Sequence, residues 1–417
     1  MQTRLADFIK NSPQGQEADV ILRSCVHCGF CLATCPTYQL LGDELDSPRG
    51  RIYLMKQMLE GQPVTQKTQL HLDRCLTCRA CESTCPSGVR YAELVDISRD
   101  LIERQVKRSA DKRLIRYLLR KVLPNPLLFK PIVKIGQALR PVLPGLLKKK
   151  VPAAVKSNNL WPESRHSRKM LVLDGCVQPT LSPNINLATA HVLDALGISL
   201  IKSPQAGCCG AIAYHLNAQE EGMDAVRKNI DAWWSFIEGN EIEAIAMTAS
   251  GCGVTVKEYG HMLRHDPAYA EKAAKVSSMT KDISEILVLE LENLQQILNR
   301  KKINSAPNKL AFHSPCTLQH GQQVRGHVEK ILQAAGFELA TVSDAHLCCG
   351  SAGTYSILQP ILSRQLLKNK ISALEAEQPE QIVTANIGCL LHLQNGTDLP
   401  VRHWIEILNA QMSSVNV

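Results

Sequence analysis

The feature that most constrains this chain is a cysteine pattern that occurs twice in its first 85 residues. The runs CVHCGFCLATCP and CLTCRACESTCP share the spacing C-x2-C-x2-C-x3-C-P, and each cysteine of the first run recurs 50 residues later. Such self-similarity marks an internal duplication. Zinc sites usually come as two C-x2-C pairs rather than as triplets with an added Cys-Pro. The pattern therefore predicts two iron-sulfur clusters held by eight thiolates.

The assignment of ligands follows from the spacing, which is that of the bacterial ferredoxin run. In such runs three cysteines bind one [4Fe-4S] cluster and the fourth binds the other cluster. We therefore predict that each cluster takes three ligands from one run and one from the other. The predicted ligands of the first cluster are Cys25, Cys28, Cys31 and Cys85. The predicted ligands of the second cluster are Cys75, Cys78, Cys81 and Cys35.

A second group of eight cysteines begins at residue 176 and repeats at an offset of 140, with a slip of three at the last pair. Each half contains a Cys-Cys-Gly sequence, and adjacent cysteines cannot easily form an unstrained disulfide. They can offer two thiolates to one metal centre, so these cysteines are candidates for a further redox or cluster site, while buried or iron-free redox thiols remain open alternatives. The set is Cys176, Cys208, Cys209 and Cys252, then Cys316, Cys348, Cys349 and Cys389.

The fold class expected is multidomain: a mostly α-helical two-cluster ferredoxin domain followed by two repeated α/β cysteine-rich domains. Each 140-residue repeat opens with a strand-like run, continues with a helical stretch closed by glycine, and has a second strand before Cys-Cys-Gly, which is typical of an α/β unit with a parallel sheet. The predicted domains are 1–105 (ferredoxin-like), 106–168 (basic, proline-containing connector), 169–300 and 301–417 (the two Cys-Cys-Gly domains).

Specific elements are also expected. The predicted helices are 48–60, 91–105, 186–196 and 324–335, the last two ended by Gly197 and Gly336. The predicted strands are 169–174, 198–202, 309–313 and 337–342. The prolines of the connector limit its helices to short pieces.

Charge is concentrated in one segment. Residues 99–150 hold fifteen Lys or Arg against three acidic residues, while the whole chain carries +8. This favours an anionic membrane face or an acidic partner, with Lys148, Lys149 and Lys150 among the contacts, or simply a solvated surface. Nucleic acid is an unlikely partner, because Tyr117 and Phe129 are the only aromatic residues of this basic segment 99–150 and stacking surfaces are missing.

Other patterns are missing from the sequence. There is no G-x-G-x-x-G, no P-loop and no C-x-x-C-H, so no flavin, nicotinamide or haem site is expected in this chain. No charged-then-apolar leader and no apolar run of 18 residues is seen, which predicts a cytoplasmic location, with association at the inner face of the cytoplasmic membrane as an option.

The connecting sequences carry a resemblance that covers nearly the whole chain. Its segments are CVHCGFCLATCPTYQLLGDELDSPRGRIYLMK, DRCLTCRACESTCPSGVRY, GCCGAIAYHLNAQ, TASGCG, PCTLQH, LCCGSAGTYS and TANIGC. Together they resemble the bacterial glycolate oxidase iron-sulfur subunits. The resemblance implies a peripheral respiratory complex in which flavoprotein subunits oxidise glycolate, and sometimes D-lactate. The iron-sulfur subunit then passes electrons towards a quinone or another acceptor and does not act on the substrate alone.

Three alternatives stay open at this point. The layout is similar to the iron-sulfur subunit of anaerobic glycerol-3-phosphate dehydrogenase. The repeats resemble the catalytic subunit of heterodisulfide reductase, which suggests a thiol or disulfide redox enzyme, but Thr255 and His392 stand where that family's longer motif closes with cysteine. That departure disfavours the unusual cluster of that family. An iron-sulfur protein that processes nucleic acid is suggested by the basic connector alone.

Overall fold

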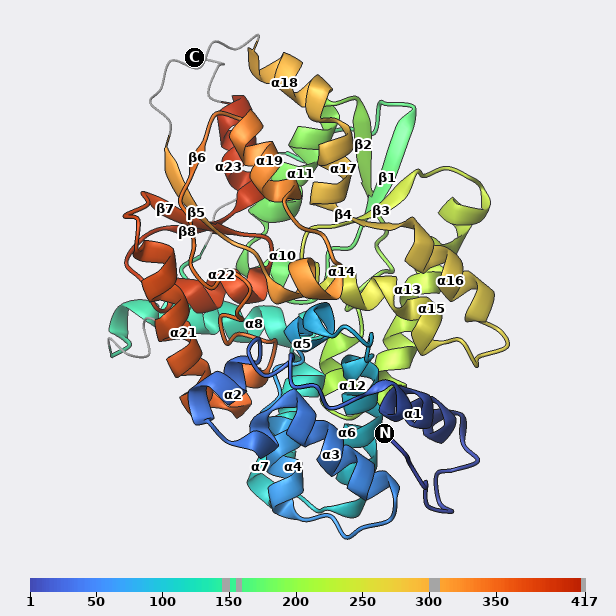
Figure 1. Ribbon diagram of the computed structural model, residues 1–417. Coiled ribbons are helices and arrows are strands. Elements are labelled where there is room, and N and C mark those ends of the chain that lie inside the picture. The colour runs from blue at the N-terminus through green and yellow to red at the C-terminus, as the bar shows by residue number, and fades with distance from the viewer. Residues whose placement is uncertain (145–150, 155–159, 300–307, 414–417) are drawn as a thin grey trace.

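A computed structural model describes residues 1–144, 151–154, 160–299 and 308–413 of the chain. Every element described in the first 105 residues is helical, as predicted (Figure 1). The expected helix 91–105 is found as α6, and 48–60 as α3, whose first turn is capped by the Ser47 hydroxyl accepting from the N–H of Gly50. The helices are α1 (Pro13–Ser24), α2 (Pro36–Leu41), α3 (Pro48–Leu59), α4 (Gln66–Asp73), α5 (Ala80–Thr84) and α6 (Tyr91–Gln105), with a 3-10 turn η1 (Glu44–Asp46).

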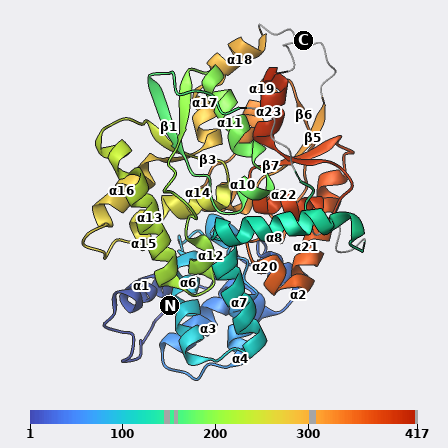
Figure 2. The same ribbon diagram turned by 180° about the vertical axis from the view of Figure 1, so that it is seen from behind.

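The connector differs from the prediction of short helices. It contains α7 (Ala110–Val122) and α8 (Pro126–Leu139), of 13 and 14 residues, followed by a 3-10 turn η2 (Arg140–Val142). Pro126 stands at the first helical position, where no N–H is required, and Pro131 is tolerated inside α8. Prolines thus separate the two helices rather than shorten them. Figure 2 shows α7 and α8 on the face that is at the back in Figure 1.

Each repeat forms a four-stranded, fully parallel sheet, with order β2-β1-β3-β4 in the first repeat and β6-β5-β7-β8 in the second. The strands of the first repeat are β1 (Arg168–Val172), β2 (Ile198–Lys202), β3 (Ala244–Met247) and β4 (Thr280–Asp282). Those of the second are β5 (Lys309–His313), β6 (Glu338–Leu339), β7 (Gln381–Thr384) and β8 (Val401–His403). The strand order is the same in both sheets, which confirms the predicted pair of α/β domains.

Helices cover both sheets. The first repeat has α10 (Gln178–Leu181), α11 (Asn184–Ala195), α12 (Ala211–His215), α13 (Gln219–Glu238), α14 (Ser250–Lys257), α15 (Tyr259–Met262), α16 (Ala270–Met279), α17 (Ile283–Leu289) and α18 (Leu291–Asn299). The second has the π-helical turn η3 (Thr317–Gly321), α19 (His327–Ala334), α20 (Tyr355–Leu358), α21 (Pro360–Glu375), α22 (Ile387–Gln394) and α23 (Trp404–Ser413).

Most of the expected elements are present, with some changed ends. Gly197 and Gly336 adopt left-handed φ values of 78° and 86° after α11 and α19, as their helix-ending role requires. The strand predicted over 337–342 is reduced to two residues, and the helix predicted from 324 begins at His327. The strand predicted to reach Asp174 ends at Val172.

The two repeats pack through matching elements. α11 of the first repeat lies on α23 of the second, and α19, the counterpart of α11, lies on α17. Such reciprocal pairing is typical of an approximate two-fold relation. One apolar core runs from Met170 in the first repeat to Met412 in the second. The helical N-terminal part lies below the paired repeats in Figure 1.

Candidate metal centres

The two cysteine runs fold alike. In the first run His27 and Gly29 have left-handed φ values of 57° and 87°, and 50 residues later Thr77 and Arg79 have 52° and 63°. Alternation of left- and right-handed residues turns successive backbone N–H groups towards one side, which makes a concavity for an anionic group such as an iron-sulfur cluster. The duplication seen in the sequence is therefore also a duplication of backbone conformation.

One small cavity collects thiols from both runs. It is lined by Cys25, Cys28 and Cys31 of the first run and by Cys85 of the second, and Cys81 also borders it. We call the first four cysteines site 1. Cys28 is exposed, and Cys31 and Cys85 are half-buried. Burial raises the pKa of the Cys31 thiol to about 11, and the neighbouring Cys25 adds to the shift. Bound iron ions would offset the mutual repulsion of these thiolates.

A second cavity collects the other four cysteines, which we call site 2. It is lined by Cys75, Cys78 and Cys81 of the second run and by Cys35 of the first. Hydrogen bonds reach two of these sulfurs: the Thr37 hydroxyl lies 3.3 Å from Cys35 Sγ, and Tyr91 Oη donates to Cys75 Sγ at 3.7 Å. Four soft sulfur donors at one cavity, under turned N–H groups, fit an iron-sulfur cluster at each site.

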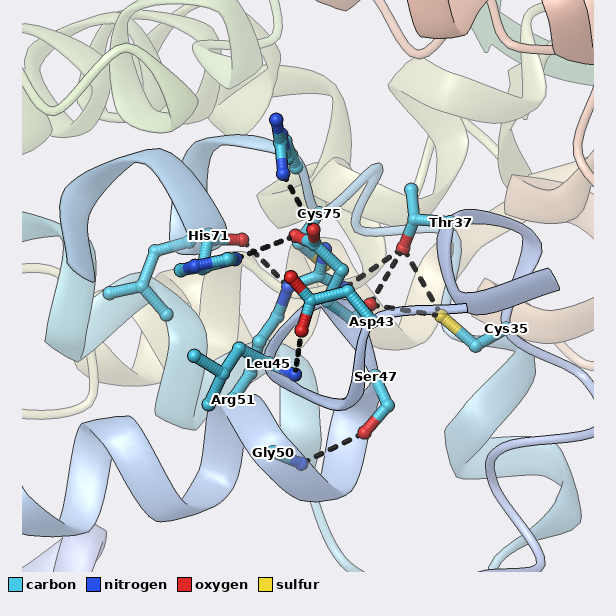
Figure 3. A network of polar contacts seen from close by, with 12 residues as sticks. Cys35, Thr37, Asp43, Leu45, Ser47, Gly50, Arg51, His71 and Cys75 are labelled. Carbon is cyan, nitrogen blue, oxygen red and sulfur yellow. Dashed lines mark hydrogen bonds and ion pairs between the residues drawn. The ribbon is translucent and has the colours of Figure 1, made fainter. Parts of the chain in front are cut away.

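A buried ionic network supports site 2 (Figure 3). The Arg51 guanidinium donates to His71 O at 2.7 Å and to Thr37 Oγ1 at 3.1 Å, and it pairs with Asp46 at 3.2 Å. Asp46 also accepts from Arg74 at 2.7 Å. Two guanidinium groups and one carboxylate thus leave positive charge beside the loop that holds Cys35. Cysteine spacing contains no signal for Arg51 or Asp46, so neither residue could be assigned to this site from the sequence.

In each repeat the predicted cysteines follow three adjacent strands, at the edge where parallel strands end and ligands gather. In the first repeat Cys176 follows β1, Cys208 and Cys209 follow β2, and Cys252 lies in the first turn of α14. Their thiols lie close enough together to affect one another's ionisation. The pKa of Cys208 lies well below its usual range because Cys176 and Cys209 donate to its sulfur.

The second repeat groups its thiols in the same way. Cys316 and Cys348 have their sulfurs 3.8 Å apart, and Cys349 is hydrogen-bonded to the thiols of Cys348 and Cys389. Hydrogen bonding to a neighbouring thiol and burial raise the pKa of Cys316, Cys348 and Cys349. His313, the last residue of β5, brings an imidazole nitrogen within 4.8 Å of the sulfurs of Cys349 and Cys389. From the sequence alone, His313 is expected to be a hydrogen-bonded polar residue near these cysteines rather than a ligand.

The glycine of each Cys-Cys-Gly has a structural reason. Gly210 and Gly350 have φ values of 91° and 90°, and a Cβ would lie 2.6 Å from Gly222 O or 2.7 Å from Ser363 O. Only glycine fits both the left-handed backbone and the close helix. The close approach holds the vicinal cysteines against α13 and α21.

One larger cavity joins all three thiol-bearing regions. It has a volume of about 290 Å³. Its sulfur-bearing lining comes from site 2, from the first repeat and from the second: Cys75, Cys78, Cys176, Cys209, Cys252, Cys316, Cys348 and Cys389. The structure therefore brings the two repeats face to face and places both next to site 2, whereas site 1 lies away from this cavity.

Polar contacts fix the N-terminal part against the repeats. Arg79, between Cys78 and Cys81, forms an ion pair with Glu258 of the first repeat. Ser83 Oγ lies 2.9 Å from His320 Nδ1, and Tyr355 Oη donates to Arg74 O at 3.1 Å. These contacts all involve the second cysteine run or its flanks, so the placement of site 2 is tied to both repeats.

Comparisons with protein families agree with this division. Residues 21–89 match the family described as "4Fe-4S dicluster domain". Residues 170–257 and 310–394 each match the family described as "Cysteine-rich domain".

Two relatives cover nearly the whole chain, and a third covers a little more than half of it. The glycolate oxidase iron-sulfur subunit of Escherichia coli K12 is 57% identical over 98% of this chain and 98% of its own length. The probable glycolate oxidase iron-sulfur subunit of Bacillus subtilis 168 is 32% identical over 90% of this chain and 89% of its own length. Lactate utilization protein A of Bacillus licheniformis is 25% identical over 57% of this chain and 97% of its own length.

Proposed function

The chain belongs to the family of glycolate oxidase iron-sulfur subunits, and we propose that it carries electrons from flavoprotein subunits that oxidise glycolate towards a quinone or another respiratory acceptor. Bound [4Fe-4S] clusters supply one-electron redox chemistry, while the protein sets their position and environment. The observation that carries the proposal is the thiol-lined cavity that joins site 2 to both repeats. The 57% identity favours this function over the glycerol-3-phosphate and disulfide-reductase alternatives.

The proposal assigns the ligands across the two runs. Site 1 would hold one [4Fe-4S] cluster and site 2 the other, because each cavity gathers three thiols of one run with the fourth of the other. The eight cysteines of the repeats would form at least one further redox centre around the shared cavity. The four segments 1–105, 106–168, 169–300 and 301–417 are proposed as the corresponding domains.

The surroundings of the two sites suggest the direction of transfer. Site 1 opens to the surface, where Val26 and Phe30 expose about two thirds of their area beside Cys28. Exposed apolar side chains around a redox site suit the docking of a partner protein. We place the flavoprotein at this surface. Electrons would then pass from site 1 to site 2 and from there to the cavity between the repeats.

The isolated chain should not oxidise glycolate, because the flavin is expected in a partner subunit. The test is reconstitution. Anaerobically prepared chain, the flavoprotein subunits and the assembled complex are each assayed for glycolate-dependent reduction of a quinone analogue. Only the complex should turn over at a substantial rate. Turnover by the flavin-free chain, or an equal rate of quinone reduction by the flavoprotein without this chain, would contradict the proposal.

The surface of α7 and α8 supports association with an anionic membrane. Leu128, Ile132, Ile135 and Leu139 form an exposed apolar stripe at helical spacing along α8. Exposed Lys130 and Lys134 accompany it on α8. An apolar stripe with basic neighbours is typical of helices that lie in the membrane interface. None of the described helices combines the length and hydropathy needed to span a bilayer. Lys148, Lys149 and Lys150, expected to contribute, lie outside the described residues.

This membrane proposal is tested with vesicles that contain phosphatidylglycerol. Replacement of Ile132 and Ile135 by Asp should abolish co-sedimentation of the full chain. Replacement of Ile361, an equally exposed side chain on α21, by Asp is the matched control and should bind like the wild type. Unchanged co-sedimentation of the double variant would remove α8 as the membrane contact.

A further inference from the structure

The two repeats differ at the positions that surround their thiols. At the 140-residue offset, His313 of the second repeat corresponds to Leu173 of the first, which belongs to an apolar core. The buried positions of α13 and α21 match at an offset of 141, so Lys370 corresponds to Asn229, whose amide donates to Cys208 O at 2.8 Å. The second repeat therefore carries an imidazole where the first repeat has hydrocarbon, and an ammonium group where the first repeat has an amide.

His313 is placed as a ligand would be. The residue is 2% exposed, and its Nε2 has no hydrogen-bond partner among the described residues. A buried polar atom left without a partner is costly and calls for an explanation, such as an ion that the protein holds. Its ring nitrogen and the sulfurs of Cys349 and Cys389 lie within 4.8 Å of one another, all three buried.

The other residues that could close the site are already satisfied. His392, which stands where a longer cysteine motif would end, has its Nε2 3.3 Å from Ser363 Oγ. Thr255, its equivalent in the first repeat, donates to Gly251 O within its own helix. The imidazole that faces the thiols is thus His313, which lies outside the cysteine motif.

Lys370 supplies charge compensation. It is 3% exposed, and its ammonium group donates to Asp344 O at 2.7 Å. Burial lowers the pKa of Lys370, while Cys348 and Cys349 beside it favour its charged form. A buried cation beside four buried sulfurs is what a thiolate-bound metal requires, because such a centre carries net negative charge in a medium of low dielectric.

We propose that the second repeat holds a metal centre in which His313 Nε2 is a ligand together with the thiolates of Cys349 and Cys389. Cys316 and Cys348, with sulfurs 3.8 Å apart, complete the donor set. Mixed nitrogen and sulfur donors suit iron, alone or in a cluster, or zinc. The first repeat, which has four thiols and no imidazole at that place, is not equivalent to it. This inference deepens the proposed electron-transfer function, and it concerns what the repeat binds rather than the overall reaction.

Metal analysis of anaerobically purified full-length chain tests the proposal. Wild-type protein should contain iron or zinc beyond the about eight irons of two cubes. H313Q should lose that excess while it keeps about eight irons, and H313C, which restores a soft donor, should recover most of it. H320Q is the matched control: His320 is also buried in the second repeat, but both of its ring nitrogens have partners, Ser83 and the carbonyl of His346. It should keep the full metal content.

A second measurement decides the case even if H313Q fails to fold. Wild-type protein labelled with ¹⁵N-histidine should show a directly coordinated nitrogen, by pulsed EPR hyperfine coupling for iron or by X-ray absorption of a mixed sulfur and nitrogen shell for zinc. Absence of excess metal in the wild type, full retention in H313Q, or a shell of sulfur alone would each overturn the proposal. If the assembled wild-type complex holds the excess metal but does not transfer electrons from glycolate, that result would instead count against the proposed function.

Discussion

The two proposed cubane sites have the same ligand spacing and different surroundings. Site 1 lies at the surface with an exposed Cys28, and backbone N–H groups such as that of His27 bond its thiols. Site 2 lies inside, receives hydroxyl groups from Thr37 and Tyr91, and rests on the buried Arg51 network. Site 2 also borders the cavity between the repeats, and site 1 does not.

This difference in surroundings bears on the reduction potentials of the two clusters and so on the direction of electron transfer between them. Reduction adds negative charge to a cluster, so hydrogen bonds to its sulfurs and nearby guanidinium groups favour the reduced form. Burial acts in the opposite sense, but in a medium of low dielectric the charges of Arg51 and Arg74 act more strongly than they would at the surface. We therefore expect site 2 to have the higher reduction potential, which makes transfer from site 1 to site 2 downhill.

The largest expected effect tests whether each cluster takes ligands from both cysteine runs. Cys85→Ala should damage the cluster whose other ligands lie in the first run, and Cys35→Ala the cluster whose other ligands lie in the second. Each variant should lose up to about four of the eight cubane irons, read out by iron analysis and EPR. If each substitution damages the cluster of its own run, the crossed assignment is wrong.

The next prediction compares how much the ion pair beside each site contributes to stability. It uses substitutions of two arginines of α3. Arg51→Met leaves Asp46, which is fully buried, without one of its partners and should lower the free energy of unfolding by about 3–5 kcal/mol. Arg49, beside site 1, pairs with Glu44 at a half-exposed position, and Arg49→Met should cost under about 1 kcal/mol. Urea unfolding of the anaerobic protein measures the free energy of unfolding of both variants. Similar losses would show that the buried network contributes no more to stability than the half-exposed ion pair.

Docking of the flavoprotein should depend on the surface of site 1. Phe30→Asp should weaken that association by about 30-fold, which is a hot-spot loss of about 2 kcal/mol. Leu289→Asp, at an exposed apolar residue of α17, is the control and should bind normally. Titration calorimetry with the flavoprotein subunits measures both. Equal affinities for the two variants would place the docking surface elsewhere.

The smallest effect concerns one hydrogen bond at site 2. Tyr91→Phe removes the hydroxyl that donates to Cys75 Sγ at 3.7 Å. A loss of about 1 kcal/mol in the reduced form corresponds to about 40 mV for a one-electron couple, so the potential of site 2 should fall by that amount while that of site 1 stays constant. An EPR-monitored redox titration resolves such a shift, and movement of both potentials would point to a general disturbance.

Much of this arrangement could be predicted from cysteine spacing and periodicity. The repeat at 140 residues predicted two α/β units, and the sheets confirm them because matching strands give matching orders. The crossed ligand assignment and the domain boundaries stay predictions. The inequality of the two sites could not be foreseen, since the two runs have the same cysteine spacing and the difference between the sites comes from Arg51, Asp46 and Tyr91, which tertiary packing brings in. The place of His313 beside Cys349 and Cys389 likewise comes from tertiary packing, and cysteine spacing does not encode it. The connector helices were underestimated because proline at a helix start is favourable.

The most direct test of the account is the order of the two cubane potentials. EPR-monitored titrations of Cys85→Ala and Cys35→Ala, each retaining one intact cluster, assign a midpoint potential to site 2 and to site 1 respectively. The account predicts that the cluster surviving in Cys85→Ala has the higher potential. A higher potential for the cluster surviving in Cys35→Ala would contradict the proposed path from the exposed site to the cavity between the repeats.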